Sequence, residues 1–235
     1  GHYAEIHRSV DSMFIQKRAL IASFKEKDTT YIHGESIIIT GKENEQIIRA
    51  FNNGKILRNN LSGKCDSIHF NQITGIAQLI NKQKNADNRS RKIKKPILWN
   101  NKSQITGDSI HIKFDTDKNI IDSLFVFNNA FIIEKDSIGL GFNQISGKRL
   151  NGSFTDGKLK EVDIIKNAES VYYLRNSENE LIGIDKSKSA KIKIFISNQN
   201  IDIFTKINQI DGKVYPEDEF DENDKLLKGF HFRED

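Results

Sequence analysis

An Asp-Ser-Ile-His tetrapeptide occurs at residues 66–69 and again at 108–111, and it gathers the residue types that serve in hydrolases. In a Ser-His-Asp triad the serine attacks a carbonyl, the histidine takes its proton and the acid orients the histidine. Those groups normally come from different segments of a fold, whereas two copies of one tetrapeptide are more simply explained as a turn that enters a strand. The sequence therefore predicts no catalytic residue, and we expect a protein that is not an enzyme.

Other chemistry-bearing patterns are equally weak. Cys65 is a lone thiol, and nothing beside it in the sequence marks a helix start or a cationic pocket that would activate it. The chain lacks a phosphate-binding P-loop, a dinucleotide fingerprint, a GxSxG elbow and a zinc-binding histidine motif. The acidic run at 217–224 lacks the glycine and the ligand spacing of an EF-hand loop. We expect no metal and no cofactor.

The charges are unevenly placed along the chain. The net charge of +4 is too small to indicate nucleic-acid binding, but residues 82–95 carry seven cations against one acid. The simplest interpretation of this segment is a solvated loop. The alternative is contact with an acidic neighbour or with the phosphates of a lipid, for which Lys92, Lys94 and Lys95 are the candidates.

Alternation of apolar and polar residues with a period of two is the main structural signal. It places Ile110, Ile112 and Phe114 on one face of 109–115, and Ile192, Ile194 and Ile196 on one face of 191–197. Residues 121–136 are apolar on both faces, so the sequence does not indicate which face of that strand points inward. No apolar run is long enough to span a membrane. The chain is predicted to be all-β and antiparallel.

Short phrases recur along the chain and indicate a repeated local structure. "FNQITG" (70–75) returns as "FNQISG" (142–147), and its core returns at 103–107 and 208–212. The terminal glycine of each copy predicts a strand end. Asparagine-containing phrases recur at 51–58, 127–134 and 165–173. Because the spacing varies over about 30 to 45 residues, we interpret them as degenerate rungs with loops of different length.

Longer stretches resemble a known family. The wording and order of six segments are similar to those of OstA-like proteins, relatives of the periplasmic lipopolysaccharide-transport protein LptA: "LSGKCDSIHF", "KPILWNNKSQITGDSIHI", "NNAFIIEKDSIGLGFNQISGKRLNGSF", "KNAESVYYL", "LIGIDKSKSAKIKIFI" and "LLKGFHF". The resemblance extends from about residue 10 to residue 232 and departs at 82–95, where this chain is longer and more basic.

The resemblance implies an open, twisted β-jellyroll, or β-taco, of antiparallel rungs that forms a single domain over 1–235. It implies a periplasmic, passive groove that carries the acyl chains of lipopolysaccharide (lipid A) as part of a protein bridge. The lining residues expected for this groove are Ile68, Phe70, Ile110, Ile112, Phe114, Phe125, Phe127, Phe131, Ile192, Ile194 and Ile196.

Two other functions compete with this one. The first is an envelope scaffold or binding module with a closed core and no lipid cargo. The second is a carbohydrate-active enzyme, for which no convergent pair of carboxylates can be named.

Assembly partners are expected at the edges of the sheet. Other OstA-type domains, or a second copy, would add a strand beside Phe14-Ile15 or beside Ile201–Phe204. Residues 1–10 are expected to be irregular, and residues 213–235 are expected to form a capping segment.

Overall fold

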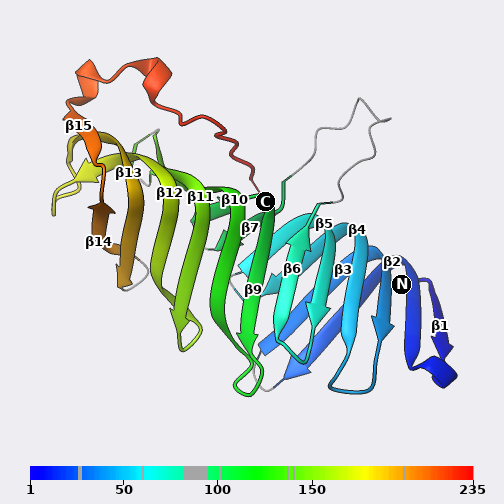
Figure 1. The fold of residues 1–235 in the computed structure, drawn as a ribbon. Coiled ribbons are helices and arrows are strands. Elements are labelled where there is room, and N and C mark those ends of the chain that lie inside the picture. The colour runs from blue at the N-terminus through cyan, green and yellow to red at the C-terminus, as the bar shows by residue number, and fades with distance from the viewer. Residues whose placement is uncertain are drawn as a thin grey trace.

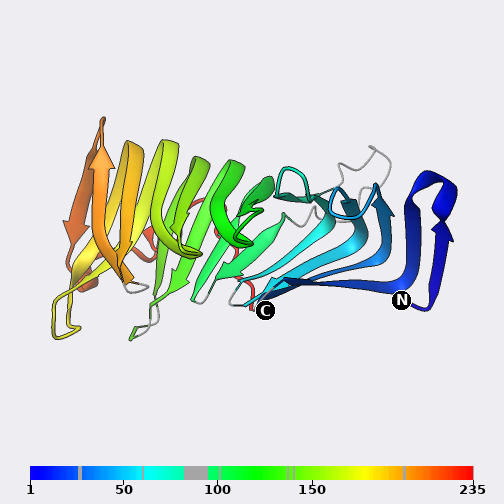
Figure 2. The ribbon, with the colours of Figure 1, turned by 90° about the horizontal axis from the view of Figure 1, so that it is seen from below.

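The chain forms one antiparallel β-sheet. The computed structural model describes residues 1–25, 28–59, 61–81, 95–100, 102–136, 138–139, 141–197 and 200–234. Its first eight strands are β1 (Tyr3–His7), β2 (Ser12–Lys25), β3 (Asp28–Thr40), β4 (Ile47–Arg58), β5 (Leu61–Asn71), β6 (Ile76–Ile80), β7 (Ile97–Asn100) and β8 (Ser103–Thr106). The others are β9 (Ser109–Asp115), β10 (Ile120–Lys135), β11 (Phe142–Thr155), β12 (Lys158–Arg175), β13 (Leu181–Ser197), β14 (Asn200–Ile207) and β15 (Asp211–Tyr215). Neighbours in sequence are mostly neighbours in the sheet, so the strands stack like rungs from one end to the other (Figures 1 and 2).

The long strands bend near their middle. The bends coincide with register shifts and with adjacent residues in the left-handed region of φ: Lys17-Arg18, Asn52-Asn53, Asn128-Asn129 and Lys166-Asn167. Asn208-Gln209, which has the same conformation, forms the corner between β14 and β15. Asparagine tolerates this conformation better than most residues because its short amide can bond locally. The recurring asparagine phrases are therefore rung elements, as predicted, and the structure shows that they are the corners.

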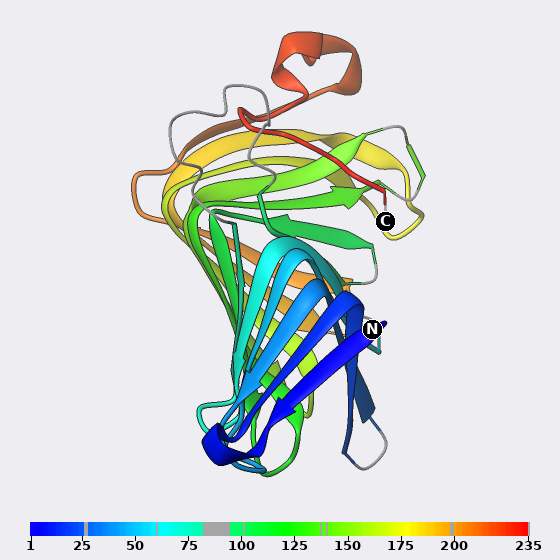
Figure 3. The ribbon, with the colours of Figure 1, turned by 90° about the vertical axis from the view of Figure 1, so that its right-hand side faces the viewer.

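The bends divide the sheet into two facing walls, which we call wall A and wall B (Figure 3). Wall A contains β1, β6, β9 and β14 with the halves of the long strands that pair with them. Wall B contains β7, β8 and β15 with the other halves. β6 and β7 pair with consecutive parts of β5, so the break between them falls at a corner.

Six segments close a ring of pairing: β5, β6, β9, β10, β8 and β7. β5 and β10 each take part in both walls, because one half pairs in wall A and the other half in wall B. The expected all-β architecture of antiparallel rungs is confirmed. This ring is closed by main-chain pairing, whereas the sequence analysis expected an open jellyroll throughout; each of its described ladders lies within wall A or within wall B.

After β15 the chain turns back across the outer face of wall B. This segment, residues 216–234, is called the strap; it contains the short 3₁₀ turns η2 (Glu217–Glu219) and η3 (Glu222–Asp224) and runs toward the middle of the stack (Figure 1).

The glycine phrases proved less uniform than predicted. Gly75 does end a turn between β5 and β6, but Gly147 lies inside β11 at its register shift.

Both ends of the stack differ in part from expectation. Residues 3–7 form β1 and Arg8–Val10 form the turn η1, where the sequence suggested an irregular start. β1 pairs with Phe14 and Ile15, so these residues do not lie on a free edge. Ile201–Phe204 belongs to β14, which is the last strand of wall A. The late edge is therefore where the sequence placed it, and the early one is not.

Candidate functional site

The space between the walls is filled by one apolar cluster. Its buried members run from Ala19 in β2 to Ile194 in β13 and come from both walls. Eight of the predicted lining residues point into it: Ile68, Phe70, Ile110, Ile112, Phe114, Ile192, Ile194 and Ile196. Ile68, Ile110 and Ile192 have no exposed surface, so the side chains of the two walls pack directly on each other in the middle of the stack.

The other three predicted lining residues do not face this space. Phe125 and Phe127 lie on the outer face of wall A, where Phe127 stacks on Phe125 at 6.5 Å between ring centroids and contacts the ring of His111. Phe131 is buried, but on the outer face of wall B beneath the strap. Their inward-facing neighbours are Leu124 and Val126. The prediction for these three phenylalanines is corrected accordingly.

Arg58 bridges the two walls in the N-terminal half of the stack. It lies at the tip of β4 in wall B, is almost fully buried, and donates hydrogen bonds to the side chain and the backbone carbonyl of Asn119, in the turn between β9 and β10 of wall A. It also donates to Thr30 Oγ1 at 3.3 Å, and its guanidinium lies 5.3 Å from the centre of the Phe114 ring. These hydrogen bonds satisfy the buried guanidinium and join the end of β4 in wall B to the β9–β10 turn of wall A.

A second bridge lies in the C-terminal half. Lys206 Nζ in β14 of wall A contacts Asp185 Oδ1 in β13 of wall B at 2.6 Å. The other carboxylate oxygen of Asp185 accepts a hydrogen bond from Ser187 Oγ at 3.0 Å, and Ser187 Oγ lies 2.9 Å from Ser170 Oγ. Two serines and a lysine therefore satisfy this buried acid, and together they hold the walls together without any substrate.

The same region has an aromatic contact between the walls. The rings of Tyr172 in β12 and Phe204 in β14 lie 5.5 Å apart. Burial raises the pKa of Tyr172, and the charges of Glu134 and Asp136 act in the same direction. Burial likewise raises the pKa of Glu134, which accepts from Ser103 Oγ at 3.5 Å. The inner face of wall B is thus polar toward its tips and apolar toward the corners.

The candidate hydrolase residues are not assembled into a triad. His69 and His111 lie in register on either side of Gln78 on the outer face of wall A. Each histidine contacts a phenylalanine ring, with His69 6.0 Å from Phe51 and His111 4.7 Å from Phe127. Burial lowers the pKa of both histidines, with a further effect of Arg49 on His69.

Cys65 has the properties of a packing residue. Burial raises the pKa of the Cys65 thiol to about 12, and Sγ donates to the carbonyl of Ser67 at 3.1 Å. A thiol with such a pKa is almost entirely protonated at neutral pH and is a poor nucleophile. Among the residues that the structure describes, no cluster of three or more His, Cys, Asp or Glu side chains could hold a metal ion.

Three lysines of the basic segment were predicted to contact phosphate groups. Lys92 and Lys94 lie outside the described residues. Lys95 Nζ lies 3.6 Å from Asp108 Oδ1, and its carbonyl accepts a hydrogen bond from Arg233. The one candidate phosphate-binding lysine that is described therefore has a carboxylate as its neighbour.

Two glutamines that the sequence analysis left without a role hold the strap. Gln104 donates from Nε2 to the carbonyl of His231 and accepts at Oε1 from the backbone N–H of Arg233, both at 2.7 Å. Gln144 makes the same pair of hydrogen bonds with Lys225 and Leu227, at 2.7 and 2.9 Å. Both glutamines come from the repeated Gln-Ile phrase, and this repetition was the signal that could have identified them.

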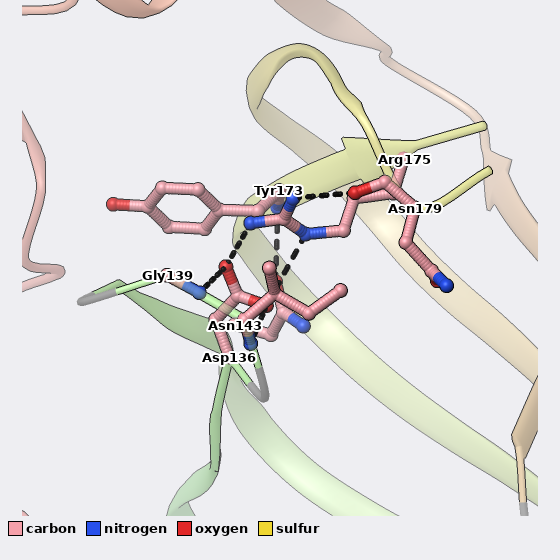
Figure 4. A network of polar contacts seen from close by, with 7 residues as sticks. Asp136, Gly139, Asn143, Tyr173, Arg175 and Asn179 are labelled. Carbon is pink, nitrogen blue, oxygen red and sulfur yellow. Dashed lines mark hydrogen bonds and ion pairs between the residues drawn. The ribbon is translucent and has the colours of Figure 1, made fainter.

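A separate polar network closes the tip of wall B (Figure 4). Arg175 at the end of β12 contacts both carboxylate oxygens of Asp136, at 2.5 and 3.3 Å, and donates to the carbonyl of Asn179 at 2.8 Å. Burial opposes ionisation of Asp136, but the hydrogen bonds from Arg175 and from the backbone outweigh it and lower its pKa. Asn143 accepts from the backbone N–H of Tyr173 beside this pair. The network fixes the ends of the strands at this tip.

No protein-family model and no curated protein sequence matches the chain. Among solved structures the chain is similar to LptH, the LptA homologous periplasmic component of the lipopolysaccharide transport device from Pseudomonas aeruginosa. The sequences are 13% identical, the TM-score is 0.46, and the match covers 66% of this chain and 95% of that one. No helix in the described part of the chain is long and apolar enough to cross a membrane.

Proposed function

We propose that this chain is a passive carrier module of a periplasmic lipopolysaccharide-transport bridge, and that the space between its walls receives acyl chains. The observation that carries the proposal is the unbroken apolar cluster from β2 to β13, which is shared by the two walls. The resemblance of the six sequence segments to OstA-like proteins is consistent with it. The chain acts without catalysis, in keeping with the dispersed positions of its serines and histidines.

The energetics of such a carrier follow from transfer of hydrocarbon out of water. Each methylene contributes about 0.8 kcal/mol, so a twelve-carbon acyl chain is stabilised by about 10 kcal/mol. Successive rungs present similar isoleucine, leucine and phenylalanine surfaces, so neighbouring positions along the stack differ little in free energy. The lipid moves from rung to rung without returning to water, and the direction of movement is imposed from outside.

Acyl chains can enter only if the walls move apart. The interior is filled by its own side chains, and the bridges Arg58–Asn119 and Lys206–Asp185 join one wall to the other. Under the proposal these bridges break while the main-chain ladders within each wall persist, because each bridge is a small set of side-chain contacts whereas the ladders extend along whole strands. Opening is thus a hinge motion at the corners.

Photo-crosslinking tests the proposal directly. A photoreactive phenylalanine at Phe114, inside, should capture lipopolysaccharide, whereas the same probe at Phe127, outside on wall A, should not. A second arm replaces Asp185 and Lys206 by cysteine in a Cys65→Ala background and ties them with a short bismaleimide. Capture at Phe114 should then be lost. The matched control is the Glu169→Cys/Lys188→Cys pair, which joins two strands of wall B and should leave capture intact.

A scaffold without lipid cargo is the second candidate, and the full burial of Ile68, Ile110 and Ile192 favours it. A closed core of this kind stabilises a spacer without any need for opening. The two functions are separated by the same experiment. Capture of lipopolysaccharide at neither Phe114 nor Phe127 would replace the carrier by the scaffold.

A further inference from the structure

One row of residues crosses the whole outer face of wall B. Each member is the register partner of the next: Ala22, Tyr31, Leu57, Ser62, Trp99, Gln104, Ile133, Gln144, Val171, Lys186 and Lys213. Side chains in one register row of a sheet lie side by side, about 4.5–5.5 Å apart at each step. The row is therefore a straight track that runs across the strands.

The C-terminal two thirds of this track hold the strap. Gln104 and Gln144 bind its backbone, Trp99 Nε1 donates to the carbonyl of Arg233 at 3.1 Å, and Lys186 Nζ contacts Asp224 at 2.5 Å. Apolar strap residues, including Leu227, fill the spaces between these polar contacts. The track thus binds an extended segment through backbone hydrogen bonds, apolar side chains and one lysine–carboxylate pair.

In the part of the chain that the structure describes, nothing covers the N-terminal third of the track, which is apolar. Tyr31 and Leu57 are register partners with 38% and 48% of their surface exposed, and Leu20, in the adjacent outward-facing row, is 52% exposed. Along the track, Ser62 separates Leu57 from Trp99, the last residue of the track for which a strap contact is described. Exposed apolar side chains that continue an occupied track indicate a second occupant.

The adjacent outward-facing row supplies positive charge. His33 is the register partner of Lys55, and Lys55 is the register partner of Lys64, whose Nζ lies 5.1 Å from the centre of the Trp99 ring. Like charges directly opposite each other destabilise a sheet. In the C-terminal half some outward lysines face acids across the ladder, as in Lys188–Glu169 and Lys193–Glu161, and Lys186, a register partner of Lys213, pairs with Asp224 of the strap. The arrangement of basic residues beside the uncovered third matches an anionic partner.

We propose that the uncovered third of the track, centred on Tyr31 and Leu57, binds an extended peptide of a partner protein in which apolar side chains alternate with acids. Its apolar residues pack on Tyr31, Leu57 and Leu20, and its carboxylates meet Lys55 and its basic neighbours. The strap is the precedent within this chain, since its Asp224 pairs with Lys186 while Leu227 is buried in the same track. This surface is outside the walls and is independent of any lipid between them.

Fluorescence anisotropy with a labelled peptide of alternating Phe and Glu tests the proposal. The wild-type chain should bind this peptide at least tenfold more tightly than a peptide of alternating Phe and Lys. Tyr31→Ser/Leu57→Ser and Lys55→Glu should each weaken binding at least tenfold. The control is Ile182→Ser, which removes an exposed apolar residue outside the track and should bind as the wild type does. All four positions are exposed, so circular dichroism should show an unchanged fold.

Each of the following results would overturn the proposal. Equal binding of both peptides, or binding insensitive to the track variants, would remove the surface as a peptide site. Tighter peptide binding in Gln104→Ala would show that the peptide displaces the strap and occupies its section. Binding of phosphatidylglycerol vesicles, or self-association, that is lost in the Tyr31→Ser/Leu57→Ser variant would assign the surface to a lipid bilayer or to a second copy.

Discussion

Gln104 and Gln144 are register partners of the same residue, Ile133, from the two strands that flank it, and each binds two backbone groups of the strap. Each side-chain amide donates to a backbone carbonyl of the strap and accepts from the backbone N–H two residues further along, as the backbone of a neighbouring strand would do. Both glutamines are almost completely buried. Two of the four copies of the repeated phrase thus perform the same task, whereas Gln72 of another copy accepts a hydrogen bond from the backbone N–H of Gln46.

Replacing either glutamine by alanine should loosen the strap. The change removes two hydrogen bonds and leaves buried backbone groups of the strap without partners, which costs about 1–3 kcal/mol per site. Hydrogen exchange should accelerate at Leu227 in Gln144→Ala and at Arg233 in Gln104→Ala, with a lower free energy of unfolding in urea. Gln78→Ala, on the outer face of wall A, is the control and should change neither. Unaltered exchange at both strap positions would mean that apolar packing alone holds the strap.

The corner asparagines should be replaceable by glycine but not by valine. Asn52 has a φ of 57°, and a β-branched side chain in that region is strained by about 1–2 kcal/mol. We expect Asn52→Val to lower the free energy of unfolding by that amount and Asn52→Gly to change it by less than about 1 kcal/mol. Lys55→Val, in extended backbone three residues later, controls for the valine itself. Equal effects of valine at both positions would contradict the role of the corner.

The inward face could be predicted where polar residues alternate with apolar ones. Ile110, Ile112 and Phe114 alternate with His111 and Lys113, so only one assignment was compatible with burial. In 121–136 both faces are apolar because residues from other parts of the chain cover the outer face of that strand. The strap covers Phe131, and on wall A Phe127 is shielded by His111 and by the guanidinium of Arg149. No local pattern contains that information.

The bridges between the walls could not be predicted for the same reason. Arg58 and Asn119 are 61 residues apart, and their contact depends on how far the two walls close over the corner. Lys206 lies on the inner face of β14, and its charge is explained by the position of Asp185 on the opposite wall. The fold class follows from periodicity, whereas these contacts follow from the angle between the walls.

The thiol of Cys65 should be unreactive while the protein is folded. Because burial raises its pKa to about 12, little thiolate is present at pH 8, and Ellman's reagent should react only as fast as the protein opens. The folded pKa lies above the value of the unfolded chain, so this group's contribution to stability is complete below about pH 9 and is lost as the pH rises further. Urea unfolding between pH 8 and 11 should show the loss in the wild type. Cys65→Ala should be less dependent on pH over that range, and rapid labelling of the folded protein would contradict the assignment.

We expect Lys206 and Asp185 to be energetically coupled, so that removing one partner alone lowers the free energy of unfolding more than removing both. Lys206→Met leaves the carboxylate of Asp185 largely buried with only serine hydroxyls as donors, and a buried charged group without its partner costs about 1–3 kcal/mol or more. Asp185→Asn leaves the ammonium of Lys206 in a similar position. The double variant Asp185→Asn/Lys206→Met removes both charges and should recover part of the loss, since apolar replacement of a whole buried pair is often nearly neutral. Free energies of unfolding from urea titrations of the three variants give the coupling between the two residues. Additive losses would show that each charge is hydrated separately and that the bridge does not hold the walls.

Under the carrier hypothesis the double variant has a second consequence, because its walls part more easily while its core is intact. Capture of lipopolysaccharide by a probe at Phe114 should then rise above the wild-type level, and a scaffold with a permanently closed core would show no such rise.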